Sequence, residues 1–194
     1  MADTTPSILS KTLQDIKKSP LQTVHNWQNS RITWLIMLGT ALFLELCALY
    51  FQYVMKLDPC EKCVYQRLAV MMLVIAPALI IISPKIMSLR LAGYGIWIAG
   101  AVYGLKEALG QLADYGEFNP FTSSCSLKPT FPFDLPLYDW WPGMFMPTGL
   151  CGADDWSLLS LNMAEWMVVI FSIYLAAAAV CVVSWIYCAF FKEA

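Results

Sequence analysis

The stretch PCEKCVYQRLAVMMLVIAPALIII, Pro59 to Ile82, decides the fold class. From Val64 onward it is almost entirely apolar, and it approaches the roughly 20 residues with which a helix crosses the hydrocarbon core of a bilayer. Just before this run, Cys60 and Cys63 stand three positions apart, and Arg67 follows four residues after the second cysteine. The stretch therefore predicts a membrane helix that opens on a pair of thiols and carries a charge close to its first turn.

The whole chain has the composition of a membrane protein. Of its 194 residues, 59% are hydrophobic and only 13% are charged, and the mean hydropathy is +0.59, which excludes an ordinary soluble domain. Four segments have the length and apolar character of membrane spans: residues 32–54, 64–82, 89–109 and 163–190. We therefore expect an all-α membrane protein, a bundle of four transmembrane helices. The remaining segments are 1–31, the loops 55–63 and 110–162, and 191–194.

The distribution of charge predicts which side of the membrane each segment faces, because cytoplasmic flanks carry an excess of lysine and arginine. The cations lie mainly in the N-terminal segment, around the turn at Ser83–Pro84 and at the C-terminus, as Lys11, Lys17, Lys18, Arg31, Lys85, Arg90 and Lys192. The segment 110–162 is acidic, with Lys128 as its single cation. We expect both termini to be cytoplasmic and the loops 55–63 and 110–162 to be periplasmic.

The long outer loop is rich in proline, glycine and aromatic residues, as in PTFPFDLPLYDWWPGMFMPTGLCG. Such a segment cannot form long helices or central strands, so we expect an irregular loop. A loop of this length without regular structure is usually functional, disordered or a linker. Its aromatic residues either lie on the membrane surface or form a face that binds a partner.

Seven cysteines divide sharply by this topology. Three of them, Cys47, Cys181 and Cys188, fall in predicted helices, where a cysteine packs as a small hydrophobic side chain. The other four fall in the outer loops, where disulfides persist: Cys60, Cys63, Cys125 and Cys151. Four cysteines permit two disulfides in three pairings, and the residues alone leave the pairing open.

Cys60 and Cys63 fall at the first turn of the second predicted helix, where unpaired N–H groups and the positive end of the helix dipole stabilise a thiolate. Arg67 returns to the same helix face about one turn deeper. A thiolate and a guanidinium at headgroup depth form a site for a lipid-soluble molecule with an acceptor oxygen, and a membrane quinone fits that description. Gln66 supplies a further donor. In the alternative interpretation, Arg67 snorkels to the interface and has no such role.

Three other polar residues fall in predicted helices. Lys106 and Glu107 lie at the outer end of the third helix, where they either neutralise each other or border the quinone site. Glu45 lies deeper in the first helix, where a carboxyl group needs a partner or a proton. The sequence assigns no role to Glu45.

The order of four membrane helices, the motif PCEKCVYQR and the segment SCSLKPTFPFDLPLYDWWPGMFMPTGLCG resemble the DsbB family of disulfide-generating membrane proteins, and in particular its DsbI branch. The resemblance implies an oxidoreductase of the bacterial inner membrane that reoxidises a periplasmic, thioredoxin-like dithiol oxidase of the DsbA or DsbL kind. It also implies that the electrons pass to ubiquinone or menaquinone.

The resemblance further implies a role for each site residue. Cys125 and Cys151 would form the disulfide that the partner attacks, with Cys125 forming the mixed disulfide. Cys60 would then exchange with Cys151, Cys63 would be the thiolate beside the quinone, and Arg67 would help to hold the quinone. These roles come from the resemblance and not from the spacing of the residues.

This chain departs from the family pattern in three ways. Gln66 stands where many relatives have a glutamate before the arginine, and the only histidine, His25, lies in the N-terminal segment and not near the outer end of the third helix. The insertion expected after the second loop cysteine in DsbI proteins is absent from the sequence. The choice of partner therefore stays open.

Two other classes of protein are compatible with four outer cysteines. In the first, the cysteines bind zinc as a tetrahedral thiolate site, although the second pair lacks the usual close spacing. In the second, the protein is a non-enzymatic membrane protein whose periplasmic disulfides only staple its loops; structural disulfides resist reduction, whereas catalytic ones exchange readily.

Overall fold

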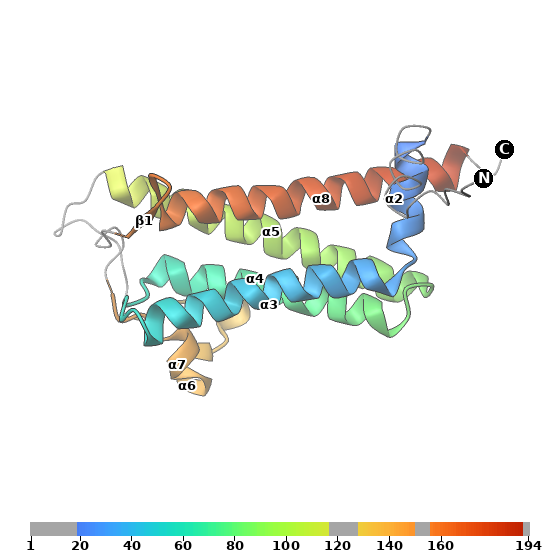
Figure 1. The fold of residues 1–194 in the computed structure, drawn as a ribbon. Helices are drawn as coiled ribbons and strands as arrows, with labels where there is room; N and C mark the ends of the chain where they lie inside the picture. The colour runs from blue at the N-terminus through green and yellow to red at the C-terminus, as the bar shows by residue number, and fades with distance from the viewer. Residues whose placement is uncertain (1–18, 117–127, 150–155, 192–194) are drawn as a thin grey trace, which may run out of the picture.

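The computed structural model describes residues 19–116, 128–149 and 156–191. Long antiparallel helices lie side by side in an elongated bundle (Figure 1): α3 (Arg31–Tyr53), α4 (Glu61–Ile82), α5 (Met87–Gly116) and α8 (Met163–Phe191). The shorter elements lie near the two ends of this bundle: α2 (Pro20–Gln28), η1 (Pro132–Asp134), α6 (Leu137–Trp140), α7 (Pro142–Phe145), β1 (Ser157–Leu158) and β2 (Leu161–Asn162).

Three of the described helices, α3, α4 and α8, are long and apolar enough to cross a membrane by length and composition. This result confirms the mostly helical membrane class that the sequence predicts. The long helix α5 is not among the three, since its sequence carries Arg90, Lys106, Glu107 and several glycines. A fourth transmembrane span therefore stays a prediction.

The helix ends differ from those expected from hydropathy. α4 begins at Glu61, three residues before the apolar span that starts at Val64, and its N-cap is Cys60, so both cysteines lie at its first turn as expected. α5 continues past Leu109, the expected end of the apolar span, to Gly116. Hydropathy marks the end of the apolar run, whereas good helix formers such as leucine and alanine carry the helix further.

A short helix in the N-terminal segment closes one end of the bundle. α2 begins with Pro20 at its first turn and lies across the end of α8 (Figure 1). Gln28 at the end of α2 donates through Nε2 to the carbonyl oxygen of Cys181 at 2.9 Å. Its Oε1 accepts from Arg90 Nη2 at 3.1 Å and from the Tyr94 hydroxyl at 2.9 Å. Buried hydrogen bonds therefore hold the N-terminal segment against α5 and α8.

The core of the bundle is built on α4, which packs against both α3 and α5. Leu73 and Ile80 of α4 are fully buried in this core. On its other side α5 packs against α8, where Gly104 lies so close to the ring of Phe171 that a Cβ at position 104 would overlap the ring. Phe171 is itself fully buried. The bundle thus depends on a small residue at this crossing point.

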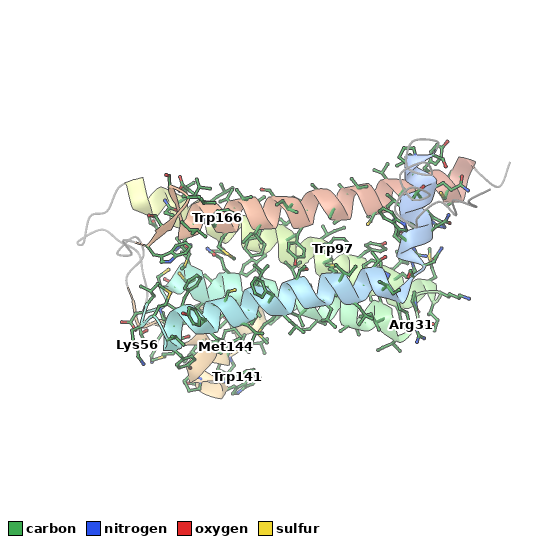
Figure 2. All side chains as sticks on the ribbon, in the orientation of Figure 1. Arg31, Lys56, Trp97, Trp141, Met144 and Trp166 are labelled. Atoms are coloured by element: carbon green, nitrogen blue, oxygen red, sulfur yellow. The ribbon has the colours of Figure 1, made fainter. Side chains whose placement is uncertain are left out.

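Residues 128–149, called the outer segment from here on, dock toward the opposite end of the bundle from α2, beside α3 and α4 (Figure 1). Phe131 and Phe145 pack edge to face with ring centroids 5.6 Å apart, and Phe131 packs in the same way on Tyr65 of α4. Figure 2 shows Met144 and Trp141 in this segment near Lys56, with Arg31 at the far end of the bundle. The segment also exposes a large aromatic side chain, since Phe133 is 94% exposed.

Candidate functional site

The first turn of α4 brings the two cysteines of the motif together. Cys60 is the N-cap residue of α4, and its Sγ accepts a hydrogen bond from the backbone N–H of Cys63 at 3.3 Å. The Sγ atoms of Cys60 and Cys63 lie 2.7 Å apart. Both sulfurs therefore lie at the positive end of a helix, where N–H donors without intrahelical partners favour an anion.

A glutamine from another helix reaches the second sulfur. Gln111 on α5 donates through Nε2 to the Sγ of Cys63 at 3.4 Å, and its Oε1 accepts from Nε2 of Gln66 at 2.7 Å. Gln111 is 1% exposed, and Gln66 is also buried. A chain of amide donors thus runs from Gln66 through Gln111 to the thiol, and each donor orients the next.

Gln111 is a site residue that the sequence analysis missed. It lies 48 positions from Cys63, beyond the predicted end of the third helix, so no local spacing connects the two residues. The only available signal was a polar residue one turn after Glu107 on the same helix. Gln66, predicted to supply a further donor to the acceptor, uses one of its N–H groups to donate to Gln111.

Arg67 lies inside the bundle, since it is only 6% exposed. Its Nη1 donates to Gln52 Oε1 at 2.6 Å and to the carbonyl oxygen of Met144 at 3.1 Å, and its Nη2 donates to the carbonyl oxygen of Ala48 at 3.3 Å. The alternative in which Arg67 snorkels to the interface is not the arrangement seen. A guanidinium has five N–H donors, so these three bonds leave two for another acceptor.

Cys63, Gln66 and Arg67 line one cavity of about 230 Å³ between α3, α4 and α8. Most of its other walls are apolar side chains, including Val70, Trp166 and Ile170. Figure 2 shows Trp166 on α8 at the same end of the bundle as Lys56. The structure therefore brings together three of the predicted site residues around an apolar space. A quinone, which is a flat apolar ring with two acceptor oxygens, fits the chemistry of this lining.

The outer segment is fixed next to the cysteine motif. The backbone N–H groups of Thr148 and Gly149 both donate to the carbonyl oxygen of Pro59, at 2.9 and 3.0 Å. The hydroxyl of Thr148 donates to Oδ1 of Asp58 at 3.1 Å. A Cβ at Gly149 would overlap the carbonyl oxygen of Asp58, so this contact requires a glycine. The backbone of the outer segment therefore rests on the residue that precedes Cys60.

The predicted site residues Cys125 and Cys151 lie outside the described residues. Along the sequence, Cys151 follows Gly149 by two positions. The structure therefore describes the attachment of the chain just before Cys151 but not the pair of loop cysteines itself.

Glu107 pairs with lysines near the C-terminal end of α5. Its Oε2 lies 3.1 Å from Nζ of Lys62, and its Oε1 lies 3.6 Å from Nζ of Lys106. None of these three residues lines the cavity that Cys63 and Arg67 share. The carboxylate of Glu107 thus pairs with the charge of Lys62 in the cysteine motif and with that of Lys106 on its own helix.

The fold and the site together define a mostly helical membrane protein with a paired-thiol motif beside an apolar cavity. The family model described as Disulfide bond formation protein DsbB matches residues 30–181 of the chain. The chain belongs to the DsbB family. The DsbI branch within that family stays a prediction.

Individual relatives agree with this result. A disulfide bond formation protein B of Shewanella sp. (strain MR-4) is 47% identical over 149 residues, which cover 77% of this chain and 85% of the relative. The protein of that name from Shewanella sp. (strain W3-18-1) is 45% identical over 147 residues, covering 76% and 83%. That of Pseudoalteromonas translucida (strain TAC 125) is 38% identical over 163 residues, covering 82% and 95%. This chain is accordingly a multi-pass membrane protein of disulfide bond formation, an oxidoreductase that forms disulfides.

Proposed function

We propose that this protein reoxidises a periplasmic, thioredoxin-like dithiol oxidase of the DsbA or DsbL kind and transfers the electrons to a membrane quinone, either ubiquinone or menaquinone. The observation that carries the proposal is the shared cavity: Cys63, Gln66 and Arg67 line one apolar space. A thiolate at its edge can donate electrons into a site from which bulk water is largely displaced by apolar walls.

The proposed relay begins at the loop cysteines. A thiolate of the reduced partner attacks the Cys125–Cys151 disulfide and forms a mixed disulfide with Cys125, and the second partner thiol then releases the oxidised partner. The Cys151 thiolate next exchanges with the Cys60–Cys63 disulfide, so that the electron pair moves to Cys63. The hydrogen bonds from Thr148 and Gly149 to Pro59 support this order, because they hold the chain near Cys60 just before Cys151.

The quinone supplies the terminal oxidising power, since a DsbA-type disulfide has a potential of about -120 mV and needs a strong acceptor. The residues of the chain bind and orient. Gln111 stabilises the Cys63 thiolate with its N–H, and Arg67 offers two remaining N–H donors to an acceptor oxygen. The carbonyl of Met144 and the side chain of Gln52 hold the guanidinium in place.

We propose that α5 is the fourth membrane span and that both termini are cytoplasmic, in the bacterial inner membrane. Arg31 and Arg90 lie at the end of the bundle that α2 covers. There, Arg90 Nη1 donates a hydrogen bond to Asn29 Oδ1 at 3.2 Å. The cysteine motif lies at the other end. The position of these two arginines, at the end away from the thiols, supports the orientation that the positive-inside rule predicts.

Trapping the mixed disulfide tests this function. A reduced partner that lacks its second, resolving cysteine should attack the Cys125–Cys151 disulfide of the wild-type protein and remain attached to Cys125, giving a covalent complex that is visible on non-reducing gels and absent from Cys125→Ala. Cys47→Ala, which removes a cysteine on α3, should not prevent trapping. A complex that forms equally without Cys125, or no complex with any reduced DsbA-type partner, would contradict the proposal and favour loop-stapling disulfides. Stoichiometric zinc in the purified protein would also contradict it.

A further inference from the structure

Glu45 is a buried carboxyl group that the fold does not satisfy. It lies on α3 and is 8% exposed. Both of its carboxyl oxygens are out of contact with solvent and have no hydrogen-bond donor in the part of the chain that the structure describes. Burying an ionised carboxylate without a donor is strongly unfavourable, so such a group is retained either with a proton or with a function.

The position of Glu45 connects it to the site. Its side chain lines the cavity of Cys63 and Arg67. It also lines a second cavity of about 420 Å³ between α3, α4 and α7, whose walls include Met144, Trp141 and Val74. Glu45 therefore lies between two cavities, the one lined by Cys63 and Arg67 and the one lined by Met144 and Trp141.

The charge of Arg67 acts on Glu45, yet the two side chains do not form a salt bridge. The guanidinium is close enough for the two charges to interact. Its hydrogen bonds, however, go to neutral oxygens of Gln52, Met144 and Ala48. The carboxyl group of Glu45 is therefore left available for chemistry beside the arginine.

Few other titratable side chains face this carboxyl group. Those that line the two cavities with it are Arg67, Cys63, Cys47, Asp58 and Tyr53. Among the described residues, those of α7 and α8 that line the cavities have no titratable side chain. Two carboxyl groups therefore line these cavities. Glu45 lies within the helix α3, whereas Asp58 lies in the loop that follows α3.

We propose that Glu45 is the proton donor for the electron acceptor bound in the cavity of Cys63 and Arg67. This inference rests on the proposed function. Converting the Cys60–Cys63 dithiol to a disulfide releases two electrons and two protons, and reducing a quinone to a quinol consumes both. Glu45 passes its proton to the acceptor oxygen as the electron pair leaves the sulfurs. The carboxylate, stabilised by the adjacent Arg67, then takes up one of the two protons released by the thiols, and the other proton goes to the second acceptor oxygen, so that no other reactant is needed.

The test compares Glu45→Gln, which keeps the shape but cannot donate a carboxylic proton, with Glu45→Asp, which keeps the acid. In quinone-free protein, infrared spectroscopy should show a carboxylic acid C=O band at neutral pH that disappears in Glu45→Gln and persists in Glu45→Asp. A control variant, Glu107→Gln, removes a buried carboxyl group that is paired with lysines and should leave this band in place.

Kinetics with a short-chain ubiquinone analogue provide the second readout. General acid catalysis contributes typically 10²–10⁴-fold, so we expect kcat in Glu45→Gln to fall by on the order of 10²-fold with little change in KM, and Glu45→Asp to recover part of this loss. A band that survives Glu45→Gln, or a variant whose only change is in KM or stability, would overturn the inference and leave the proposed function intact. A wild-type protein that does not reduce the analogue would overturn both.

Discussion

Gln111 on α5 donates a hydrogen bond to the Sγ of Cys63 on α4 over 3.4 Å. This contact joins the C-terminal part of one long helix to the first turn of another. Because Gln111 in turn accepts from Gln66, the amide cannot rotate without losing a buried hydrogen bond. The donor is therefore fixed toward the sulfur before any substrate arrives.

Replacing Gln111 tests whether this donor activates the thiol. In Gln111→Leu, the Cys63 thiolate loses a hydrogen bond, and a bond to a charged group is worth about 1.5–3 kcal/mol. We expect alkylation of Cys63 by iodoacetamide to slow by roughly tenfold at neutral pH. The rate is measured at Cys63 itself by mass spectrometry of the reduced protein. Gln66→Leu, which keeps Gln111 but removes its hydrogen-bond support, should have a smaller effect; equal rates in Gln111→Leu and wild type would contradict the role.

Replacing Arg67 tests how the acceptor is held. Arg67→Met removes the guanidinium and should raise the apparent KM for a quinone by about tenfold or more, since at least one charge-assisted hydrogen bond is lost. Both disulfides should still form. Arg67 also holds the carbonyl of Met144, so the matched control is Tyr53→Phe, which loosens the same segment by removing a 2.8 Å hydrogen bond to Gly143. An unchanged KM in Arg67→Met would count against the quinone role.

Adding one methyl group at Gly149 tests the contact between the outer segment and the cysteine motif. In Gly149→Ala the new Cβ overlaps the carbonyl oxygen of Asp58, so the segment must move away from Pro59. We expect steady-state oxidation of the partner to slow by about tenfold, as overpacking costs about 1–3 kcal/mol. Trapping of the partner at Cys125 should be unaffected. Gly39→Ala is the control, because a Cβ there meets no atom within 4 Å; equal losses in the two variants would refute the explanation.

A second glycine tests the packing of α5 on α8. Gly104→Ala would press a methyl group into the buried ring of Phe171 and should destabilise the protein by about 1–3 kcal/mol. Gly95→Ala places a methyl group where no atom lies within 4 Å and should leave stability unchanged or raise it. Thermal unfolding in detergent measures both. If both variants unfold at the wild-type temperature, the α5–α8 contact is looser than described.

The features that depend on local spacing could be predicted from the sequence. Hydropathy marks α3, α4 and α8, because each is a continuous apolar run. The placement of Cys63 and Arg67 on one cavity follows from a separation of four residues on one helix. The helix ends were predicted less well, as α5 shows, because a helix does not end where its apolar surface ends.

The features that depend on distant parts of the chain could not be predicted. Gln111 reaches Cys63 only because α5 packs against α4, and Thr148 reaches Pro59 only because the outer segment folds back over about 90 residues of sequence. Polar residues such as these give no periodic signal. Glu45 could be recognised as anomalous in an apolar helix, but its position between two cavities comes only from the packing of α3 and α4.

The most direct test of the whole account is the anaerobic reduction of a short-chain ubiquinone by the purified protein and a reduced DsbA-type partner. The account predicts that the quinone absorbance falls in equimolar proportion to the partner disulfide formed, and that Cys63→Ser abolishes this loss. Oxidation of the partner without any consumption of quinone, or the same consumption in Cys63→Ser, would contradict it.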